Sequence, residues 1–345
     1  MKKSGEDFWR ELRKNRFFDE LKYFLKRLQE ESEARRVRLV LVLNPRSTQA
    51  KRAEVEILKP LNRFIFEEKL VSNVTTFRYE VQPTHVDDNA EKLASCLLDG
   101  DIILVVGGDG TASIGVNGVI LSGKKVKFYS IPYGNFNDIA RTLQRARGRK
   151  VYAMEALVNE KHFRYALCYF TAGMLAESTK IFNEKKIRER LRRRKKNLIF
   201  SLWILFVWFI ENRKKQWFFR FRMETLDING KILGSKIFEP RFFWGGVSDL
   251  IALNGATMAR ILGGGEYYLG NRFLVRCARL GSFLGVSGFM LKGIFGRVSG
   301  GEVSASKYIF EHPASFEIQA EGELKRFDEV STLEFRKVEK SLQIL

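Results

Sequence analysis

The stretch Ile102-Ile103-Leu104-Val105-Val106-Gly107-Gly108-Asp109-Gly110-Thr111 decides the fold class of this chain of 345 residues. Its first five residues are β-branched or aliphatic, which is typical of a strand buried on both faces of a parallel sheet. The strand ends abruptly in glycines, and small and apolar residues at helical spacing follow through Ile120. Glycines at the carboxyl end of a strand let the backbone turn where a Cβ would clash, and they let a phosphate approach the exposed N–H groups. The stretch therefore predicts a strand, an anion-binding loop and a helix in succession.

Asp109 is the one carboxylate among these glycines. Beside an anionic phosphate, a carboxylate requires a cation between the two, or it acts as a base that faces a hydroxyl. A second unit of the same kind lies downstream, where an expected strand over residues 126–131 leads into Pro132-Tyr133-Gly134-Asn135-Phe136-Asn137-Asp138 and a helix. Two such loops at the same edge of one sheet form a nucleotide-binding crevice.

The first part of the chain alternates between expected strands and expected helices. The strands are residues 37–43 and 75–82, and the helices are residues 53–68 and 87–98. This alternation predicts an α/β fold with an open, mostly parallel sheet, which makes residues 37–148 the nucleotide-binding domain.

Three motifs together resemble one family. They are Asn44-Pro45 after the first strand, Gly-Gly-Asp-Gly-Thr at 107–111, and Pro-x-Gly-x-x-Asn-Asp-x-Ala-Arg at 132–141. In order, spacing and strand–loop–helix context they are similar to the catalytic domain of diacylglycerol kinases, a lipid-kinase family shared with sphingosine kinases and bacterial soluble lipid kinases. The resemblance extends from Arg38 to the C-terminus. It implies ATP and Mg²⁺ as cofactors and the hydroxyl of a lipid as the phosphoryl acceptor.

The resemblance also assigns roles to residues, because phosphoryl transfer depends mostly on positioning and charge neutralisation. Asp109 is the expected Mg²⁺ ligand and a catalytic residue. A base near the lipid hydroxyl is expected at Glu321 or Glu323, which match the family's closing hairpin. Asn44 is equally suited to hold its turn through its side chain, and both roles stay open. The expected nucleotide-binding residues are Asn44, Pro45, Gly107, Gly108, Gly110, Thr111, Gly134, Asn135, Asn137 and Asp138.

The sequence departs from the family pattern at three places. Ile114 stands where the pattern Gly-Gly-Asp-Gly-Thr-x-x-Glu has glutamate, Glu321 replaces the aspartate of Asp-Gly-Glu, and no Asp-Gly pair follows the triple glycine 263–265. These departures motivate one alternative, a catalytically weakened, membrane-associated nucleotide-binding protein of the same fold. Another alternative is an enzyme like NAD kinase, which also uses Gly-Gly-Asp-Gly. The Asn-Asp-x-Ala-Arg signal and an apolar insert in the later half favour a lipid substrate.

The composition of the chain changes after Lys150. Residues 164–170, 217–223 and 236–244 are expected strands, with a turn signal at Asp227-Ile228-Asn229-Gly230. They predict a second, mainly antiparallel β domain for the lipid substrate over residues 149–330. Residues 331–345 are expected to form a C-terminal strand that returns to the first domain.

A basic and apolar insert, residues 185–215, interrupts this second domain. Its apolar part, residues 198–210, would reach about 20 Å as a helix, short of the ~30 Å hydrocarbon core of a bilayer. Two alternatives remain: a buried helix of the second domain, or an interfacial helix whose flanking cations meet lipid head groups. The N-terminal extension, residues 1–36, has amphipathic helical spacing, and it is expected either to dock on the body of the protein or to lie in the membrane interface. Residues 272–297 interleave Phe, Leu and Gly with Arg and Lys, as either a membrane-facing surface or a solvated helix face.

The net charge of +20 calls for a polyanionic partner, either nucleic acid or an anionic membrane surface. The basic residues cluster beside Trp and Phe in an apolar run, outside any recognisable nucleic-acid fold, so we expect no nucleic-acid partner. Three dispersed cysteines indicate no disulfide framework, and the N-terminus lacks the apolar core of a signal peptide. We therefore expect a cytoplasmic lipid kinase, peripheral at the inner face of the membrane. Diacylglycerol is the first candidate substrate, a sphingoid base is another, and a homodimer is left open.

Overall fold

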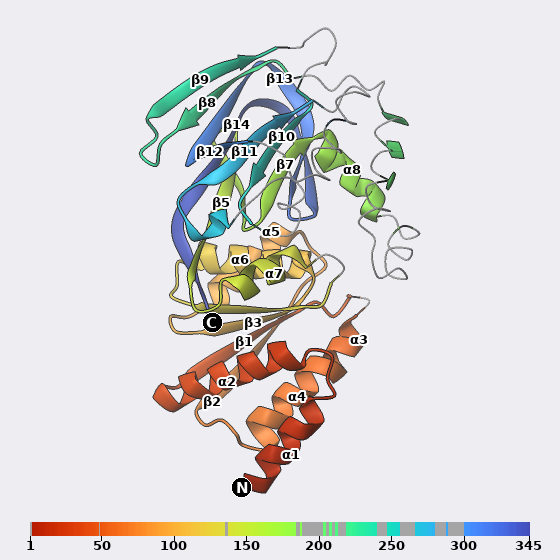
Figure 1. Ribbon diagram of the computed structural model, residues 1–345, viewed down its shortest axis with the longest axis vertical. Coiled ribbons are helices and arrows are strands. Elements are labelled where there is room, and N and C mark those ends of the chain that lie inside the picture. Colours follow the sequence, from red (N-terminus) through yellow and green to blue (C-terminus); the bar gives the residue numbers. More distant parts are fainter. Residues whose placement is uncertain are drawn as a thin grey trace. The chain divides into compact units, whose positions relative to one another are not determined.

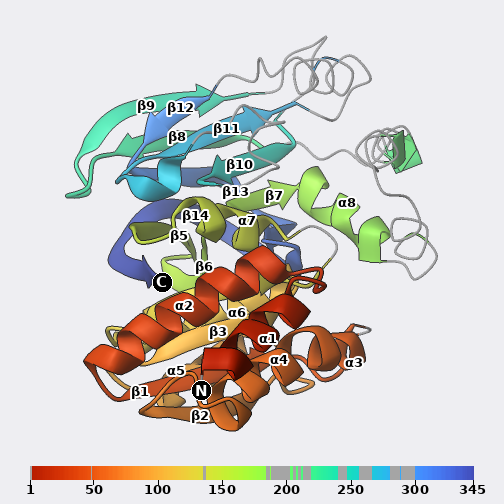
Figure 2. The same ribbon diagram turned by 60° about the horizontal axis from the view of Figure 1, so that its bottom comes forward.

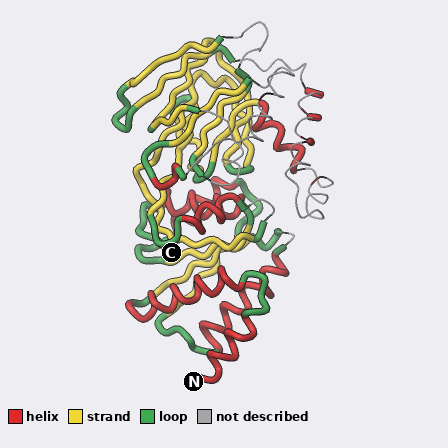
Figure 3. Tube along the Cα trace, in the orientation of Figure 1, coloured by secondary structure: helices red, strands yellow, loops and turns green. Residues whose placement is uncertain are grey.

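The computed structural model describes residues 2–47, 49–134, 137–183, 219–239, 247–255, 266–279 and 300–345, together with residues 187, 203, 204, 207, 208, 211, 212 and 288. The chain divides into two compact units. Unit 1 consists of Met1–Val151 and Leu342–Leu345, and unit 2 consists of Tyr152–Ser341. Helices and strands share unit 1, whereas strands dominate unit 2 (Figure 3).

The sheet of unit 1 is parallel. Its strands are β1 (Val37–Leu43), β2 (Val74–Glu80), β3 (Ile102–Gly107) and β4 (Lys127–Pro132), in the order β4-β3-β1-β2. Every pair among them is parallel, and the end of β14 (Glu323–Ile344) adds in parallel to β4. β3 is buried along its whole length, because helices cover both faces of the sheet. The open, mostly parallel sheet predicted from the sequence is confirmed.

Helices form a layer on each side of this sheet (Figure 1 and Figure 2). One layer contains α1 (Lys2–Leu12), α2 (Phe18–Ala34) and a helical stretch of α3 (Ala50–Ala53), η1 (Glu54–Leu58), α4 (Lys59–Asn62) and η2 (Arg63–Glu67). The other layer contains α5 (Val86–Cys96), α6 (Asp109–Ser122) and α7 (Asp138–Arg145). α6 lies very close to the sheet at Gly115, where an added Cβ would lie 2.7 Å from Val105.

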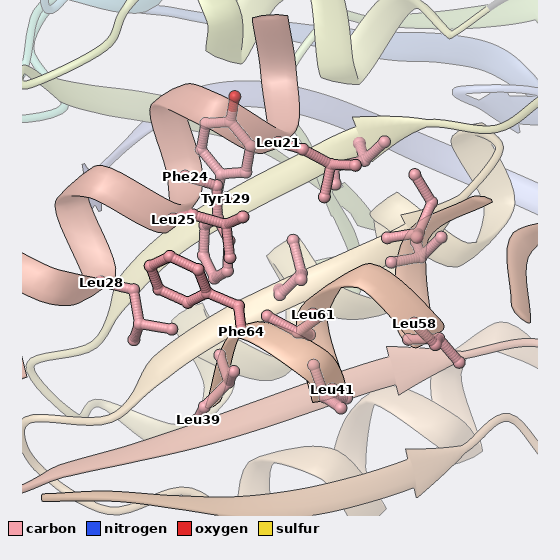
Figure 4. Close-up of a cluster of buried hydrophobic side chains, with 14 of the residues drawn as sticks. Leu21, Phe24, Leu25, Leu28, Leu39, Leu41, Leu58, Leu61, Phe64 and Tyr129 are labelled. Carbon is pink, nitrogen blue, oxygen red and sulfur yellow. The ribbon is translucent and has the colours of Figure 1, made fainter. Parts of the chain in front are cut away.

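α2 buries its apolar face in the core of unit 1 (Figure 4). Leu21, Phe24, Leu25 and Leu28 are fully buried, and the ring of Phe24 lies 5.4 Å from that of Tyr129 on β4. Residues 1–36 were expected as an extension whose apolar face either docks on the protein or lies in a membrane. In the structure this face packs against the sheet. Its apolar residues recur at the 3.6-residue spacing of a helix, so they lie on the side that meets the core.

Unit 2 is built around antiparallel strands. In the order β12-β11-β10-β7-β13-β14 every described neighbouring pair runs antiparallel, and β8 joins β9 and β13 while β5 joins β6 and β14. The elements are β5 (Lys150–Val158), β6 (Lys161–Ala166), β7 (Tyr169–Gly173), α8 (Met174–Asn183), β8 (Phe221–Leu226), β9 (Ile232–Phe238), β10 (Asp249–Leu253), η3 (Tyr267–Leu269), β11 (Phe273–Ala278), β12 (Gly301–Val303) and β13 (Ala305–Ala320). The expected second, antiparallel β region is thus confirmed as part of the fold class.

Several expected boundaries differ from the structure. The prediction of one strand over residues 164–170 is wrong, because β6 ends at Ala166 and β7 begins at Tyr169. The N–H groups of the two residues between them donate to Glu321. The C-terminal strand expected over residues 331–345 begins earlier, because β14 runs without interruption from Glu323 to Ile344. The helix expected from residue 53 already begins at Ala50.

Some predictions fall outside the described residues. These are Asn135, the triple glycine 263–265, most of the insert 185–215, and most of the stretch 272–297, whose described part contains the strand β11 instead of a helix. Among the described helices, none is both long enough and apolar enough to cross a lipid bilayer.

Candidate functional site

Three loops of unit 1 meet at the carboxyl edge of its parallel sheet. Leu43 of β1 pairs with Val106 of β3, and Gly107 of β3 pairs with Pro132 of β4. The loops that follow these strands therefore begin side by side. This arrangement brings together the motifs at Asn44, Gly108 and Gly134, as the sequence predicted for neighbouring parallel strands.

The two glycine loops touch through their backbones. A Cβ added to Gly134 would lie 2.5 Å from the Cα of Gly108, and one added to Gly108 would lie 3.1 Å from the Cα of Gly134. The carbonyl of Gly107 also accepts a hydrogen bond from the N–H of Tyr133 at 2.9 Å. Both glycines are therefore required by close backbone approach, and the two loops form one surface.

Asn137 closes the second loop. Its backbone is left-handed, with φ of 54°, and it precedes the first residue of α7. Its Oδ1 accepts a hydrogen bond from the N–H of Gly134, and its Nδ2 donates to the carbonyl of Gly134, each at 2.7 Å. Asparagine tolerates this conformation better than most residues. Asn137 therefore shapes the loop through its own side chain, and Asp138 follows as the buried first residue of α7.

Asp109 connects the two loops. It is half-buried at the first position of α6, and its Oδ1 accepts a hydrogen bond from the N–H of Ile139 in α7 at 3.1 Å. Burial raises the pKa of Asp109, and hydrogen bonds from the backbone of Ile139 and Asp138 oppose that rise. A nearby cation would favour the ionised carboxylate. Through its hydrogen bond from Ile139, the carboxylate holds the N-terminus of α7 in place.

The described side chains at this edge of the sheet suit one way of binding Mg²⁺. Across the described part of the chain, no three His, Cys, Asp or Glu side chains gather as a metal site. Mg²⁺ is commonly held by one or two carboxylates with substrate phosphates and water as the other ligands. Asp109 suits that arrangement as a single protein carboxylate beside backbone N–H groups.

The N-terminus of α6 supplies the phosphate-binding geometry. Gly108 precedes the helix in an extended conformation, and α6 runs for 14 residues from Asp109. First-turn N–H groups lack partners within a helix, and the helix dipole favours an anion there. Gly110 and Thr111 lie in that first turn. An added Cβ at Gly107 would lie 2.6 Å from the Cβ of Thr111, so Thr111 packs directly on the end of β3.

Asn44 holds its own turn. Its Oδ1 accepts a hydrogen bond from the N–H of Arg46 at 3.1 Å, and its carbonyl accepts one from the N–H of Ser47 at 3.0 Å. Of the two roles left open for Asn44, the structure shows the turn-holding one. Asn44 and the exposed Pro45 line a cavity of about 30 Å³ that Gly107 and Tyr133 also border. That volume holds about one water molecule.

Tyr133 is a residue of this site that the sequence did not single out. Its hydroxyl donates to Oε2 of Glu56 at 2.6 Å, and Arg52 donates to Oε1 of the same carboxylate at 2.7 Å. Its ring lies 4.9 Å from that of Phe17. Tyr133 fills the variable position of Pro-x-Gly, so the motif itself gave no signal. Through Glu56, Tyr133 connects the second loop to η1.

Glu321 and Glu323 belong to unit 2, where they lie at the hairpin between β13 and β14. Glu321 is buried, with φ of 53°, and its Oε1 accepts hydrogen bonds from the N–H groups of Leu167 and Cys168 at 2.6 and 2.7 Å. Because of this contact, the strand is interrupted between β6 and β7. Glu323 is half-buried and pairs with Ala320.

Asn254 joins the same loops of unit 2. Its Nδ2 donates to the carbonyls of Tyr152 and Leu167 at 2.8 and 2.7 Å, and its N–H donates to the carbonyl of Cys168 at 2.7 Å. Lys337, which the sequence did not single out, donates to Oδ1 of Asn254 and to the carbonyl of Tyr152. Burial lowers the pKa of Lys337 to about 7. The expected asparagine-glycine turn and the closing hairpin are thus brought together within unit 2.

The position of Ile114 explains one departure from the family pattern. Ile114 lies inside α6 and is 3% exposed, so its side chain belongs to the apolar packing of unit 1. A glutamate there would need a charged or hydrogen-bonded partner.

Comparison with known proteins supports these observations. Residues 38–169 match the family described as the diacylglycerol kinase catalytic domain. No curated protein sequence matches the chain. The match confirms the resemblance that the three motifs indicated, and it supports a kinase.

The chain is also similar to three solved structures from Bacillus anthracis str. Sterne. Two are provisionally described as diacylglycerol kinases: one has a TM-score of 0.57 and 14% identity, covering 90% of this chain and 97% of that chain. The other has a TM-score of 0.54 and 15% identity, covering 89% and 97%. A third, described as a diacylglycerol kinase, has a TM-score of 0.51 and 13% identity, covering 89% and 96%. At these identities the likeness shows a shared fold.

Proposed function

We propose, from the diacylglycerol kinase catalytic domain that residues 38–169 match, that this chain is an ATP- and Mg²⁺-dependent kinase of a membrane lipid hydroxyl. Diacylglycerol is the first candidate acceptor. The observation that supports the proposal most is the contact between the two glycine loops, with Asp109 bonded across them. Phosphoryl transfer needs positioned N–H donors and a carboxylate for the metal, and this edge of the sheet has both.

Each residue of unit 1 has a defined part in this proposal. The N–H groups of Gly108, Gly110 and Thr111 bind phosphate oxygens at the N-terminus of α6. Asn44, Pro45, Gly134, Asn137 and Asp138 shape the nucleotide side of the loops. Asp109 holds the metal, which when bound neutralises charge on the phosphates.

Glu321 is the proposed base for the lipid hydroxyl in unit 2. Two backbone N–H donors fix the direction of its carboxylate. A base is effective only when it is held within hydrogen-bond reach of the proton that it removes. Glu323, at the start of β14, is the second choice.

The test measures transfer of the labelled γ-phosphate of ATP to a lipid extract, with the product identified by mass. Asp109→Asn keeps the side-chain oxygen that accepts from Ile139 but removes the charge, so activity is expected to fall about 10²–10³-fold. Asp99→Asn is the matched control, because Asp99 lies on an exposed turn and accepts from the N–H of Lys125. Full activity of Asp109→Asn would refute the role assigned to this carboxylate.

A catalytically weakened nucleotide-binding protein is the second candidate, and the buried Ile114 favours it. This candidate expects ATP to bind, as measured by calorimetry, without turnover on any lipid. It also expects Ile114→Glu not to restore activity, because a charge buried in the packing around α6 is unfavourable without a partner. Labelled lipid product from the parent chain excludes this candidate.

A further inference from the structure

The hairpin of β8 and β9 ends in an exposed apolar turn. The two strands pair from Phe221 opposite Phe238 to Leu226 opposite Ile232, and residues 227–231 connect them. Both views show this turn projecting from the rest of unit 2 (Figure 1 and Figure 2). Ile228 in the turn is 55% exposed, and the adjoining residues of β9, 232 and 233, are 54% and 67% exposed. We call residues 227–233 the hairpin tip.

The hairpin is irregular at Leu233. Thr225 lies opposite Gly234 and Leu226 lies opposite Ile232, so the register shifts and Leu233 has no opposite residue on β8. An extra residue of this kind makes a bulge, and a bulge redirects the side chain that it carries. The irregularity therefore adds a third exposed aliphatic side chain to the hairpin tip.

Backbone donors of the tip have partners within the tip. The N–H of Asp227 donates to the carbonyl of Lys231 at 2.9 Å, and the N–H of Gly230 donates to the carbonyl of Asp227 at 3.1 Å. Oδ1 of Asp227 accepts from the N–H groups of Asn229 and Lys231 at 2.9 and 2.8 Å. A backbone donor without a partner is costly in an apolar layer. The tip can therefore leave water without that cost at these N–H groups.

Exposed lysines accompany the apolar side chains. Lys231 lies in the tip and Lys236 follows on β9. Among the acidic residues of the hairpin, Glu224 is ion-paired and Asp227 accepts from the backbone of the turn. A lysine can keep its stem in an apolar layer while its ammonium stays among head groups. Anionic head groups attract such cations, and the whole chain carries a net charge of +20.

We infer that the hairpin tip inserts into the head-group layer of an anionic lipid bilayer. Its three aliphatic side chains enter the boundary of the acyl chains, and Lys231 lies at the level of the lipid phosphates. The inference rests on the proposed function, since a kinase of a membrane lipid has to reach a bilayer. A small apolar element alone holds a protein only weakly to a membrane, and a second, electrostatic signal strengthens it. The tip and the surrounding positive charge are these two signals.

The first test measures flotation with vesicles of phosphatidylglycerol and phosphatidylcholine. Leu233→Asp is expected to weaken partition into the vesicles by about tenfold, because an exposed leucine no longer leaves water on binding. Leu98→Asp is the matched control, since Leu98 of unit 1 is also 55% exposed and the change in charge is the same. It should leave partition close to that of the parent chain.

The second test removes the cation of the tip. Lys231→Gln is expected to weaken partition into the same vesicles by about fivefold. Lys161→Gln, at an exposed lysine on β6, is the control and should stay close to the parent chain.

The third test reports the surroundings of the tip directly. Ile228→Cys is labelled with a fluorophore whose emission shifts to shorter wavelength in an apolar layer, and this shift is expected when the vesicles are added. Lys161→Cys, labelled in the same way, should show no shift. The labelled parent chain corrects for Cys96 and Cys277, which are partly buried.

One comparison separates this inference from the proposed function. Leu233→Asp should transfer phosphate normally to lipid dispersed in detergent and poorly to lipid in vesicles. A parent chain that transfers no phosphate would contradict the proposed function, while flotation and fluorescence would still test the tip. Equal flotation of the parent chain and Leu233→Asp would overturn the inference, as would an unshifted label at position 228 on a chain that floats. An equal loss of transfer in detergent and in vesicles would overturn it too, because the effect would then lie in catalysis.

Discussion

At the residue scale, one carboxylate in each unit accepts a hydrogen bond from the backbone near the start of a helix. Asp109 accepts from the N–H of Ile139 near the start of α7, and Asp249 accepts from the N–H of Leu175 near the start of α8. Burial raises the pKa of both carboxyls. The difference lies in their surroundings: Asp109 lies beside glycine loops at the edge of a parallel sheet, whereas Asp249 is fully enclosed. The same capping contact therefore serves a proposed metal site in one unit and packing in the other.

Asp249 gives a pH-dependent prediction. Burial raises its pKa to about 7 in the folded protein, against about 3.9 in an unfolded chain. Between those values the folded state keeps a proton that the unfolded state releases, so stability is full below pH 4 and falls as pH rises toward 7. The loss is at most about 1.4 kcal/mol per pH unit.

Asp249→Asn should remove this dependence, since its oxygen still accepts from Leu175 but does not titrate. Chemical denaturation at several pH values measures the effect. We expect a flatter stability profile between pH 4 and 7 than for the parent chain. Asp328→Asn, at an exposed carboxylate, should keep the parent profile. Parallel profiles for Asp249→Asn and the parent would show that Asp249 is ionised throughout.

At the element scale, the sequence left two alternatives for α2: a helix that docks on the protein or one that lies in a membrane. An amphipathic helix has the same spacing whether its apolar face meets a protein core or a membrane, so periodicity alone could not decide. The contacts decide it, since Leu21, Phe24, Leu25 and Leu28 are enclosed by the sheet and α4.

Phe24→Ala should therefore destabilise unit 1. Removal of a fully buried phenylalanine costs about 3–5 kcal/mol in free energy of unfolding. Denaturant unfolding followed by circular dichroism measures the change. Lys26→Ala, on the exposed face of the same helix, should change stability by less than about 0.5 kcal/mol. Equal, small effects for the two variants would mean that α2 does not hold unit 1 together.

Strand elements show what local patterns can and cannot predict. The run from Ile102 to Val106 predicted β3, because five aliphatic residues before glycine have few other structures available. The break between β6 and β7 could not be predicted, because Glu321 binds Leu167 and Cys168 from 154 and 153 residues away. The role of Lys337 has the same origin, since its partners Tyr152 and Asn254 are distant in sequence.

At the scale of the whole molecule, the expectation of an anionic partner surface rests on composition. The net charge of +20 favours an anionic surface. The candidate nucleotide loops were predictable because glycines and one carboxylate follow strands that lie side by side.

The charge gives a prediction for the intact chain. We expect flotation with vesicles that contain anionic lipid, little flotation with zwitterionic vesicles, and a loss of binding as salt rises from 0.1 to 1 M, where the Debye length falls from about 10 to 3 Å. Salt-insensitive binding to both kinds of vesicle would contradict an electrostatic membrane contact.

The long strand β14 has a consequence for the order in which the protein is made. Its last residues, Gln343 and Ile344, pair with β4, and the N–H of Leu345 donates to the carbonyl of Phe128. A ribosome delivers β4 early, yet delivers the strand beside it only after all of Tyr152–Ser341. During synthesis this side of β4 has no partner strand for that interval, and an unpaired strand edge can pair with other chains.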